Sequence, residues 1–142
     1  MKLFLSTPIS CYTNQTEYVN YRNTILHFVR NLRLKFEVYS EIEEIENLKQ
    51  FDSPDESLLK DFSLINNCDC FILHYPKKLA TSALVELGFA LANNKKIIVI
   101  TTSYSILPYL IQGIPQVFSG SIILVKNNLD DELASTISSI LL

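Results

Sequence analysis

The chain has 142 residues, about the length of one ordinary domain, and 48% of them are hydrophobic, enough for a core without disulfides or metals. Its formal net charge is −3 and its basic residues are scattered, which gives no electrostatic basis for binding nucleic acid or an anionic membrane. No stretch approaches the roughly 20 apolar residues of a membrane span, and the apolar start stops too soon for a signal peptide. We expect one cytoplasmic domain over residues 1–142 that takes a small-molecule ligand.

The three cysteines do not have the spacing of a secreted disulfide framework. On a strand, Cys68 and Cys70 would project to the same side, as in half of a metal site, but no second Cys or His cluster completes a ligand set. We interpret them as buried small hydrophobic side chains. The expectation is a protein without a metal and without a resident cofactor.

The first predicted strand is the apolar run at residues 3–5. Apolar residues between positions 18 and 32 then recur at helical spacing. The residues able to cap that helix are Thr13, Asn14 and Thr16. Residues 36–39 are β-branched and aromatic and predict a second strand. The acidic residues 41–50 predict either a short helix or a loop lying over a site.

The next helix is predicted to start at Ser53 and Pro54, because a capping residue followed by proline is typical of a first turn. Glu56 has the spacing of a capping box with Ser53. The apolar side chains expected to face the core from this helix are Leu58, Leu59, Phe62 and Ile65. Residues 70–73 predict the third strand.

A third helix follows, with Thr81 or Ser82 as its predicted cap. Gly88 in its interior costs about 1 kcal/mol relative to alanine, which suggests that another element approaches closely there. Residues 97–100 and 122–125 are continuous apolar runs, typical of parallel strands covered on both faces.

Residues 129–142 predict a closing helix with acidic residues in its first turn. Five strands that alternate with helices predict an α/β fold with a parallel sheet covered on both faces. Right-handed crossovers leave few topologies. We expect a flavodoxin-like, Rossmann-like doubly wound sheet in the order 2-1-3-4-5.

In such a sheet, ligands bind beyond the carboxyl ends of the strands, near the point where the strand order reverses. The loops after the first and third strands therefore carry most candidate substrate-binding residues. These residues are Ser6, Thr7, Pro8, Ser10, His74, Tyr75, Thr81 and Ser82. The chain has only three glycines and lacks a glycine-rich phosphate loop, which excludes a dinucleotide fingerprint or a Walker loop.

Glu86 stands out because it lies early in a helix whose other residues are almost all apolar. Such a carboxylate either faces solvent or points into a pocket, and the helix N-terminus would stabilise its charge. Asp61 is the second candidate carboxylate, with a solvated helix face as its structural alternative. Asp69 is the third, with a turn or cap at the strand start as its alternative.

Three runs form one pattern: Asp61 with Ile65 four residues later, Cys68-Asp69 before a strand, and Glu86-Leu87-Gly88-Phe89-Ala90 followed by Lys95, Lys96 and an apolar strand. This pattern resembles the nucleoside 2-deoxyribosyltransferase family. The match covers most of residues 1–101. The resemblance implies that Glu86 attacks the anomeric carbon of a nucleoside or nucleotide, that Asp61 assists at the base or in proton transfer, and that the protein is at least a dimer.

The sequence departs from that family at three places. Phe4 stands where the family has a tyrosine that supports the nucleophile, residues 76–78 replace a loop aspartate, and residues 80–82 replace a glycine-rich approach to the glutamate. TIR domains are similar in fold and also place a glutamate on a helix after a serine-containing loop. Lys77 and Lys78 could meet a pyrophosphate.

Three functions therefore stay open. The first is cleavage or transfer at a base–sugar bond of a nucleoside or nucleotide. The second is a TIR-like enzyme that consumes NAD⁺ and makes a nucleotide signal, for example in bacterial antiphage defence. The third is a nucleotide-binding module without turnover.

The apolar residues 106–111 predict either a subunit interface or an amphipathic helix that covers the sheet.

Overall fold

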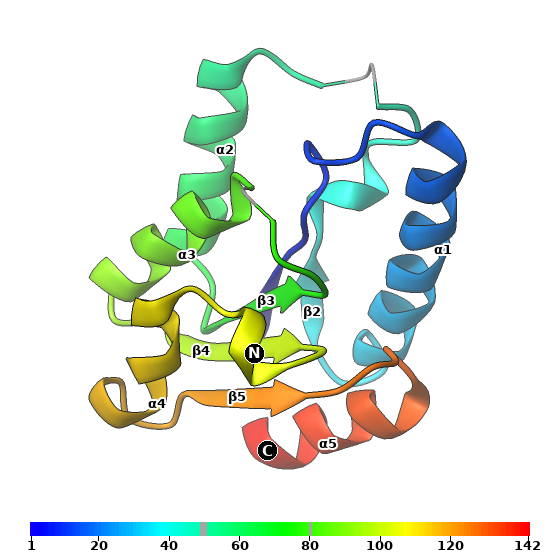
Figure 1. Cartoon of the computed structure of the whole chain (residues 1–142). Coiled ribbons are helices and arrows are strands. Elements are labelled where there is room, and N and C mark those ends of the chain that lie inside the picture. Colours follow the sequence, from blue (N-terminus) through cyan, green and yellow to red (C-terminus); the bar gives the residue numbers. More distant parts are fainter. Residues whose placement is uncertain (49–50, 80) are drawn as a thin grey trace.

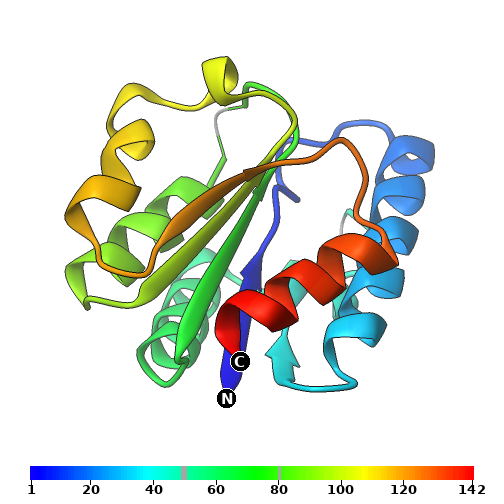
Figure 2. The ribbon, with the colours of Figure 1, turned by 90° about the horizontal axis from the view of Figure 1, so that it is seen from below.

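Five parallel strands form one sheet in the order β2-β1-β3-β4-β5, shown from two sides in Figures 1 and 2. The computed structural model describes residues 1–48, 51–79 and 81–142. The strands are β1 (Lys2–Ser6), β2 (Glu37–Tyr39), β3 (Cys70–Tyr75), β4 (Lys96–Thr101) and β5 (Ile122–Val125). This topology confirms the predicted doubly wound, flavodoxin-like sheet.

Helices cover both faces of the sheet. The α-helices are α1 (Gln15–Leu32), α2 (Pro54–Asn66), α3 (Ala83–Ala92), α4 (Ile114–Val117) and α5 (Asp131–Leu141). Short 3₁₀ segments lie at η1 (Glu41–Glu43), η2 (Tyr104–Ile106) and η3 (Tyr109–Gly113). α1 and α5 pack on one face, whereas α2, α3 and α4 pack on the other (Figure 2). None of the helices in the described part of the chain combines the length and the apolar character needed to cross a membrane.

Alternation along the strands assigns each buried side chain to one of two cores. Leu3 and Leu5 of β1 join the core under α1 and α5, whereas Phe4 between them joins the core under α2 and α3. In β3, Ile72 belongs to the first core and Leu73 to the second. This period of two follows from the pleat, which points successive side chains to opposite faces.

Two predictions about α2 are wrong. Ser53 precedes the helix but its side chain makes no capping hydrogen bond, so the capping box does not form. Leu58 and Leu59 are exposed, and the buried residues of α2 are Asp61 and Ile65. The reason is the position of α2, which packs against α3 and turns its first half toward a cavity that Leu58 helps to line.

The expectation of a close approach at Gly88 is also wrong. Gly88 is exposed, and no atom lies within 4 Å of the place where a Cβ would be.

The prediction that residues 122–125 form a strand covered on both faces is also wrong. β5 is the edge strand of the sheet, and its four residues are half-buried or exposed.

The apolar residues 106–111 do not form one amphipathic helix. They fall on the end of η2, the two residues that follow it, and the start of η3, and the side chains of Leu107 and Ile111 are buried in the core under α2 and α3. Tyr109 and Leu110 project outward and are 87% and 84% exposed. The segment therefore covers the sheet with part of its side chains, and the predicted oligomer stays a prediction.

The N-caps of α1 and α2 should contribute unequally to stability. The Asn14 side chain accepts a hydrogen bond from the Glu17 backbone N–H at 3.0 Å, whereas Ser53 caps nothing. We expect Asn14→Ala to lower the free energy of unfolding by about 1 kcal/mol and Ser53→Ala to change it by less than about 0.5 kcal/mol. Urea unfolding measures both values, and equal losses would contradict this assignment.

Candidate active site

A cavity of about 420 Å³ opens beyond the carboxyl end of β1, between the β1–α1 loop, η1 and the first turns of α2 and α3. Its described lining consists of Thr7, Ile9, Ser10, Glu41, Phe51, Asp52, Pro54, Ser57, Leu58, Asp61, Phe62, Thr81, Ser82, Ala83, Val85 and Glu86. The position agrees with the rule that parallel sheets bind ligands where the strand order reverses. We call it the carboxyl cavity.

Three carboxyl groups from three different elements meet in this cavity. Glu41 of η1, Asp61 of α2 and Glu86 of α3 each offer an oxygen that lies within 4.8 Å of the other two. Asp61 is 7% exposed, and the other two are partly buried. Groups of like charge at this separation repel one another, so neighbouring elements must hold them in place.

A hydrogen bond from the sheet holds Glu86. The Ser6 hydroxyl, at the last residue of β1, donates to Oε1 of Glu86 at 2.7 Å. Ser6 is two residues after Phe4 and lies on the same face of the sheet, toward α2 and α3. The strand end therefore positions the glutamate of the helix above it.

Ring stacking and backbone contacts hold the other two carboxyls. The rings of Phe62 on α2 and Phe89 on α3 stack with their centroids 3.9 Å apart, next to Asp61 and three residues from Glu86. Arg22 of α1 anchors η1, because its guanidinium donates to the backbone oxygens of Ile42 and Glu43 at 3.0 and 2.9 Å. The position of Glu41 is thus tied to α1.

The pKa of each carboxyl is raised. Burial, followed by the charge of Asp61, raises the pKa of Glu41 from 4.5 to about 7. Burial raises the pKa of Asp61, and its hydrogen bond with Glu86 opposes that rise. Burial also raises the pKa of Glu86 well above 4.5; the Ser6 hydroxyl opposes the rise, and the charge of Asp61 adds to it.

Burial therefore favours the protonated form at both Asp61 and Glu86, and each group affects the pKa of the other. Glu86 lowers the pKa of Asp61, whereas the charge of Asp61 raises the pKa of Glu86. The Oδ1 atom of Asp61 is buried without a hydrogen-bond partner among the described residues. Such a pair can supply both a carboxylate and an acid within one site.

The structure brings most of the predicted loop residues to this cavity. Thr7, Ser10, Thr81 and Ser82 line it, together with Asp61 and Glu86. Ser6 is not among the lining residues, but its hydroxyl donates a hydrogen bond to Glu86, which lines the cavity. Pro8 belongs to the same loop and is buried, but it is not among the lining residues.

Three predicted residues lie elsewhere. Asp69 precedes β3 at the opposite end of the sheet and accepts a hydrogen bond from the Lys2 backbone N–H at 2.7 Å, the structural alternative considered for it. His74 points to the face of α1, where its ring meets Tyr21. The Tyr75 hydroxyl bonds the backbone of Leu79 within the β3–α3 loop. The pleat separates these neighbours because successive strand residues face opposite sides.

Sequence reasoning did not single out Glu41, Asp52 or Tyr39. The acidic run at 41–50 was expected to form a short helix or a loop over a site, and η1 does bring Glu41 to the cavity; Lys49 and Gln50 lie outside the described residues. Tyr39 pairs in register with Phe4, and its buried hydroxyl has no partner among the described residues. The charges of Glu44, Asp61, Glu41 and Glu86 add to burial in raising the pKa of Tyr39.

The same three carboxyls have a spacing that could suit a divalent cation, which prefers oxygen ligands. Exposed and half-buried acidic groups are common without an ion, and the cluster alone does not establish a metal site. The expectations of a metal-free protein and of no resident cofactor stay predictions.

Comparison with known proteins gives a likeness of fold. No family model matches the chain, and no curated protein matches it. Among solved structures, the CMP N-glycosidase BcmB of Clostridium botulinum superposes with a TM-score of 0.70 at 24% sequence identity, over 98% of both chains. This likeness shows the shared fold. The apo form of the NADH:FMN oxidoreductase EMOB, with a TM-score of 0.49 and 14% identity over 98% of this chain and 87% of that one, supports no conclusion.

The raised pKa of Glu41 makes stability fall as the pH rises. Between about pH 4.5 and 7, the folded protein keeps a proton on Glu41 that the unfolded chain has released, so the free energy of unfolding decreases over this window. We expect Glu41→Gln to be more stable than the wild type at pH 8 and to lose that advantage toward pH 4.5. Urea unfolding across this range measures the difference.

Glu56→Gln, at an exposed position of α2, is the matched control and should track the wild type. A Glu41→Gln variant whose stability relative to the wild type does not depend on pH would contradict the assignment.

Proposed function

We propose that the protein cleaves or transfers the N-glycosidic bond of a nucleoside or nucleotide, with Glu86 as nucleophile and Asp61 as proton donor and acceptor. The observation that carries this proposal is the carboxyl pair. Asp61 and Glu86 line one cavity of about 420 Å³ with oxygens within 4.8 Å of each other, burial raises the pKa of both, and the Ser6 hydroxyl donates a hydrogen bond to the glutamate.

The separation of the carboxyls favours a covalent route. Glycosidases that invert the sugar keep their carboxyls roughly 6.5–9.5 Å apart to admit a water between them, whereas the double-displacement enzymes hold them about 5–5.5 Å apart. Here the oxygens lie within 4.8 Å. The nearest oxygens of Asp61 and Glu86 are too close to hold the water of an inverting site between them, which favours attack by Glu86 itself.

In the first step, Oε of ionised Glu86 attacks the anomeric carbon and the carbon–nitrogen bond breaks, so its electron pair leaves with the base. Asp61 gives its proton to the departing nitrogen, and a glycosyl ester of Glu86 remains. In the second step, water or another acceptor gives its proton to Asp61 and displaces Glu86. Both carboxyls return to their starting state.

The reaction starts from one protonation state of the pair. It needs Glu86 ionised and Asp61 protonated, and burial raises the pKa of both groups. The Ser6 hydroxyl opposes this rise at Glu86, because it stabilises the ionised carboxylate. The two carboxyls lie close enough for a proton to pass between them without a third group.

The fold comparison supports the same class of reaction. The neighbour with the TM-score of 0.70 is named as an N-glycosidase of CMP, and it aligns over nearly the whole of both chains. The resemblance of residues 61–69 and 82–91 to nucleoside 2-deoxyribosyltransferases points to the same bond.

A second candidate is cleavage of NAD⁺, and the charge of the cavity favours it. Four acidic residues line the carboxyl cavity, namely Glu41, Asp52, Asp61 and Glu86, and none of its described lining residues is lysine or arginine. Such a lining attracts a ligand whose base carries a positive charge. The nicotinamide ring of NAD⁺ is such a base, and a neutral base that becomes protonated is another.

The decisive test is base release by the wild type and by Glu86→Gln, with deoxynucleosides plus a free base, with nucleoside monophosphates, and with NAD⁺. We expect one of these substrates to release its base and Glu86→Gln to lower the rate by about 10³-fold or more. Chromatography of the released base identifies the substrate class.

Glu56→Gln is the control and should keep full activity, because Glu56 is exposed and outside the cavity. Equal turnover by Glu86→Gln and the wild type would overturn the role of Glu86. A wild type that binds these ligands without turnover would indicate the binding-module alternative.

Ser6→Ala tests how the glutamate is tuned. Losing the 2.7 Å hydrogen bond removes a group that favours ionised Glu86, so the pKa of Glu86 rises further. We expect the acidic limb of the pH–rate profile to move to higher pH. Ser63→Ala, on the exposed side of α2, should leave the profile unchanged. A Ser6→Ala profile shifted to lower pH, or not at all, would refute this tuning.

A further inference from the structure

A second cavity, of about 450 Å³, lies at the same edge of the sheet on the side of α1 and α5. The β1–α1 loop lines both cavities, with Thr7, Ile9 and Ser10 in the first and Tyr12 in the second. The polar side chains that line this second cavity are those of Tyr12, Tyr21, Thr24, His74, Lys77, Asn127 and Asn128. We call it the donor cavity.

The two cavities have opposite chemistry. Each polar side chain of the donor cavity can donate a hydrogen bond, and no aspartate or glutamate stands among its described lining residues. The carboxyl cavity has four acidic side chains and, in its described lining, no lysine or arginine. A lining of donors with one cation favours an anion, whereas the acidic cavity disfavours one.

His74 makes the donor cavity a built site rather than a surface depression. His74 is only 7% exposed to solvent, and its Nδ1 shares a hydrogen bond with the Tyr21 hydroxyl at 2.7 Å. Burial lowers the pKa of His74 to about 4, so the ring is neutral at physiological pH. Within the described part of the chain, no hydrogen bond uses its second ring nitrogen, which is left for a ligand.

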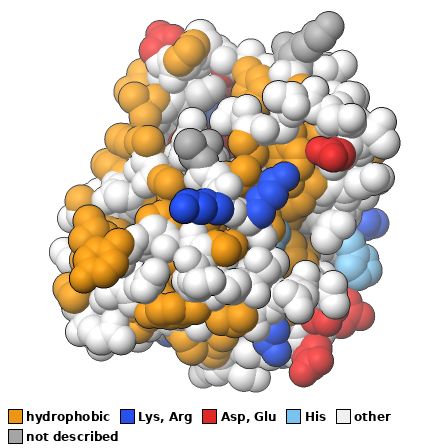
Figure 3. All heavy atoms as spheres, in the orientation of Figure 1, with side chains coloured by type: hydrophobic (Ala, Val, Ile, Leu, Met, Phe, Trp, Pro, Cys, Tyr) orange, Lys and Arg blue, Asp and Glu red, His pale blue; other side chains and the backbone are white. Residues whose placement is uncertain are grey.

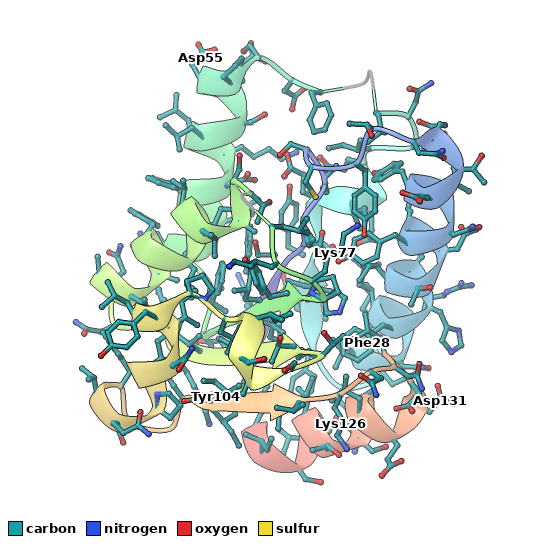
Figure 4. The ribbon with its side chains drawn as sticks, viewed as in Figure 1. Phe28, Asp55, Lys77, Tyr104, Lys126 and Asp131 are labelled. Carbon is teal, nitrogen blue, oxygen red and sulfur yellow. The ribbon has the colours of Figure 1, made fainter. Side chains whose placement is uncertain are left out.

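Stacked rings hold the lysine at the cavity. Tyr12 stacks on Tyr21 at 5.0 Å, and Tyr21 stacks on His74 at 5.6 Å. The Lys77 ammonium lies over the Tyr12 ring, 5.2 Å from its centroid. Among the described residues, Lys77 forms no ion pair with a carboxylate. Figure 4 shows it between α3 and α1, and Figure 3 shows basic side chains near the centre of this face.

We propose that the donor cavity binds the phosphate group of a nucleotide, with Lys77 supplying the charge and His74, Asn127 and Asn128 supplying hydrogen bonds. The volume exceeds that of a phosphate ion and leaves room for an attached sugar. The site stands apart from Glu86, so it does not depend on the proposed reaction.

Equilibrium binding to the Glu86→Gln protein tests the site without turnover. The probes are cytidine 5′-monophosphate, cytidine and inorganic pyrophosphate, each titrated by calorimetry. We expect Lys77→Gln in this background to weaken binding of the monophosphate and of pyrophosphate about tenfold or more, with cytidine unaffected. Lys78→Gln is the matched control, since Lys78 is also exposed but does not line the cavity, and it should bind all probes as the parent does.

Asn128→Asp is a second variant that places a carboxylate at the exposed rim, and it should also weaken the two phosphorylated probes. Equal binding by the Lys77→Gln and Lys78→Gln variants, or monophosphate binding no tighter than that of cytidine, would overturn the proposal. Because binding is read in Glu86→Gln, a protein without glycosidase activity still gives a clear answer.

The origin of the phosphate follows from turnover in the protein with Glu86 intact. If the phosphate belongs to the substrate, Lys77→Gln lowers kcat/KM for the monophosphate and leaves that for the nucleoside unchanged. If it belongs to a separate nucleotide, Lys77→Gln leaves both values unchanged while binding to the Glu86→Gln protein still weakens.

Discussion

The crowding of Glu41, Asp61 and Glu86 is the constraint on which the site depends. Three carboxyls lie within 4.8 Å of one another and are partly removed from water, so burial raises the pKa of each, and the charge of Asp61 raises those of Glu41 and Glu86 further. The fold holds the arrangement by one strand-end hydroxyl, one pair of stacked rings and one arginine that anchors η1. Raised pKa values of this kind allow one cavity to hold an acid beside a carboxylate, as the proposed reaction requires.

The pleat of the central strands gives the two cavities at the carboxyl edge of the sheet different linings. β1 sends Ser6 toward α2 and α3, where it meets Glu86, and β3 sends His74 toward α1, where it meets Tyr21. One loop, from β1 to α1, then contributes to both cavities. The carboxyl cavity therefore suits a cationic or neutral group, whereas the donor cavity suits an anion.

Much of the fold was predictable because apolar periodicity depends on local sequence. The five runs that predicted strands all became strands, and the order 2-1-3-4-5 followed from their alternation with helices. Predictions were wrong where burial is decided by a distant element. Leu58 and Leu59 have the spacing of a core stripe, yet α2 buries Asp61 instead, because its inner side faces the carboxyls of η1 and α3 rather than the sheet alone.

By itself, the sequence determined the doubly wound sheet, a short set of candidate caps that includes Asn14, and Glu86 as a carboxylate in apolar surroundings with Asp61 as the second candidate. Only the tertiary structure decided that Glu41 joins them, that His74 and Tyr75 serve opposite faces, and that Asp69 lies at the far end of its strand. The physical reason is range. Hydrophobic period and turn chemistry act between neighbours in the chain, whereas the pKa of a carboxyl depends on which charges and hydroxyls the fold brings within a few ångströms of it.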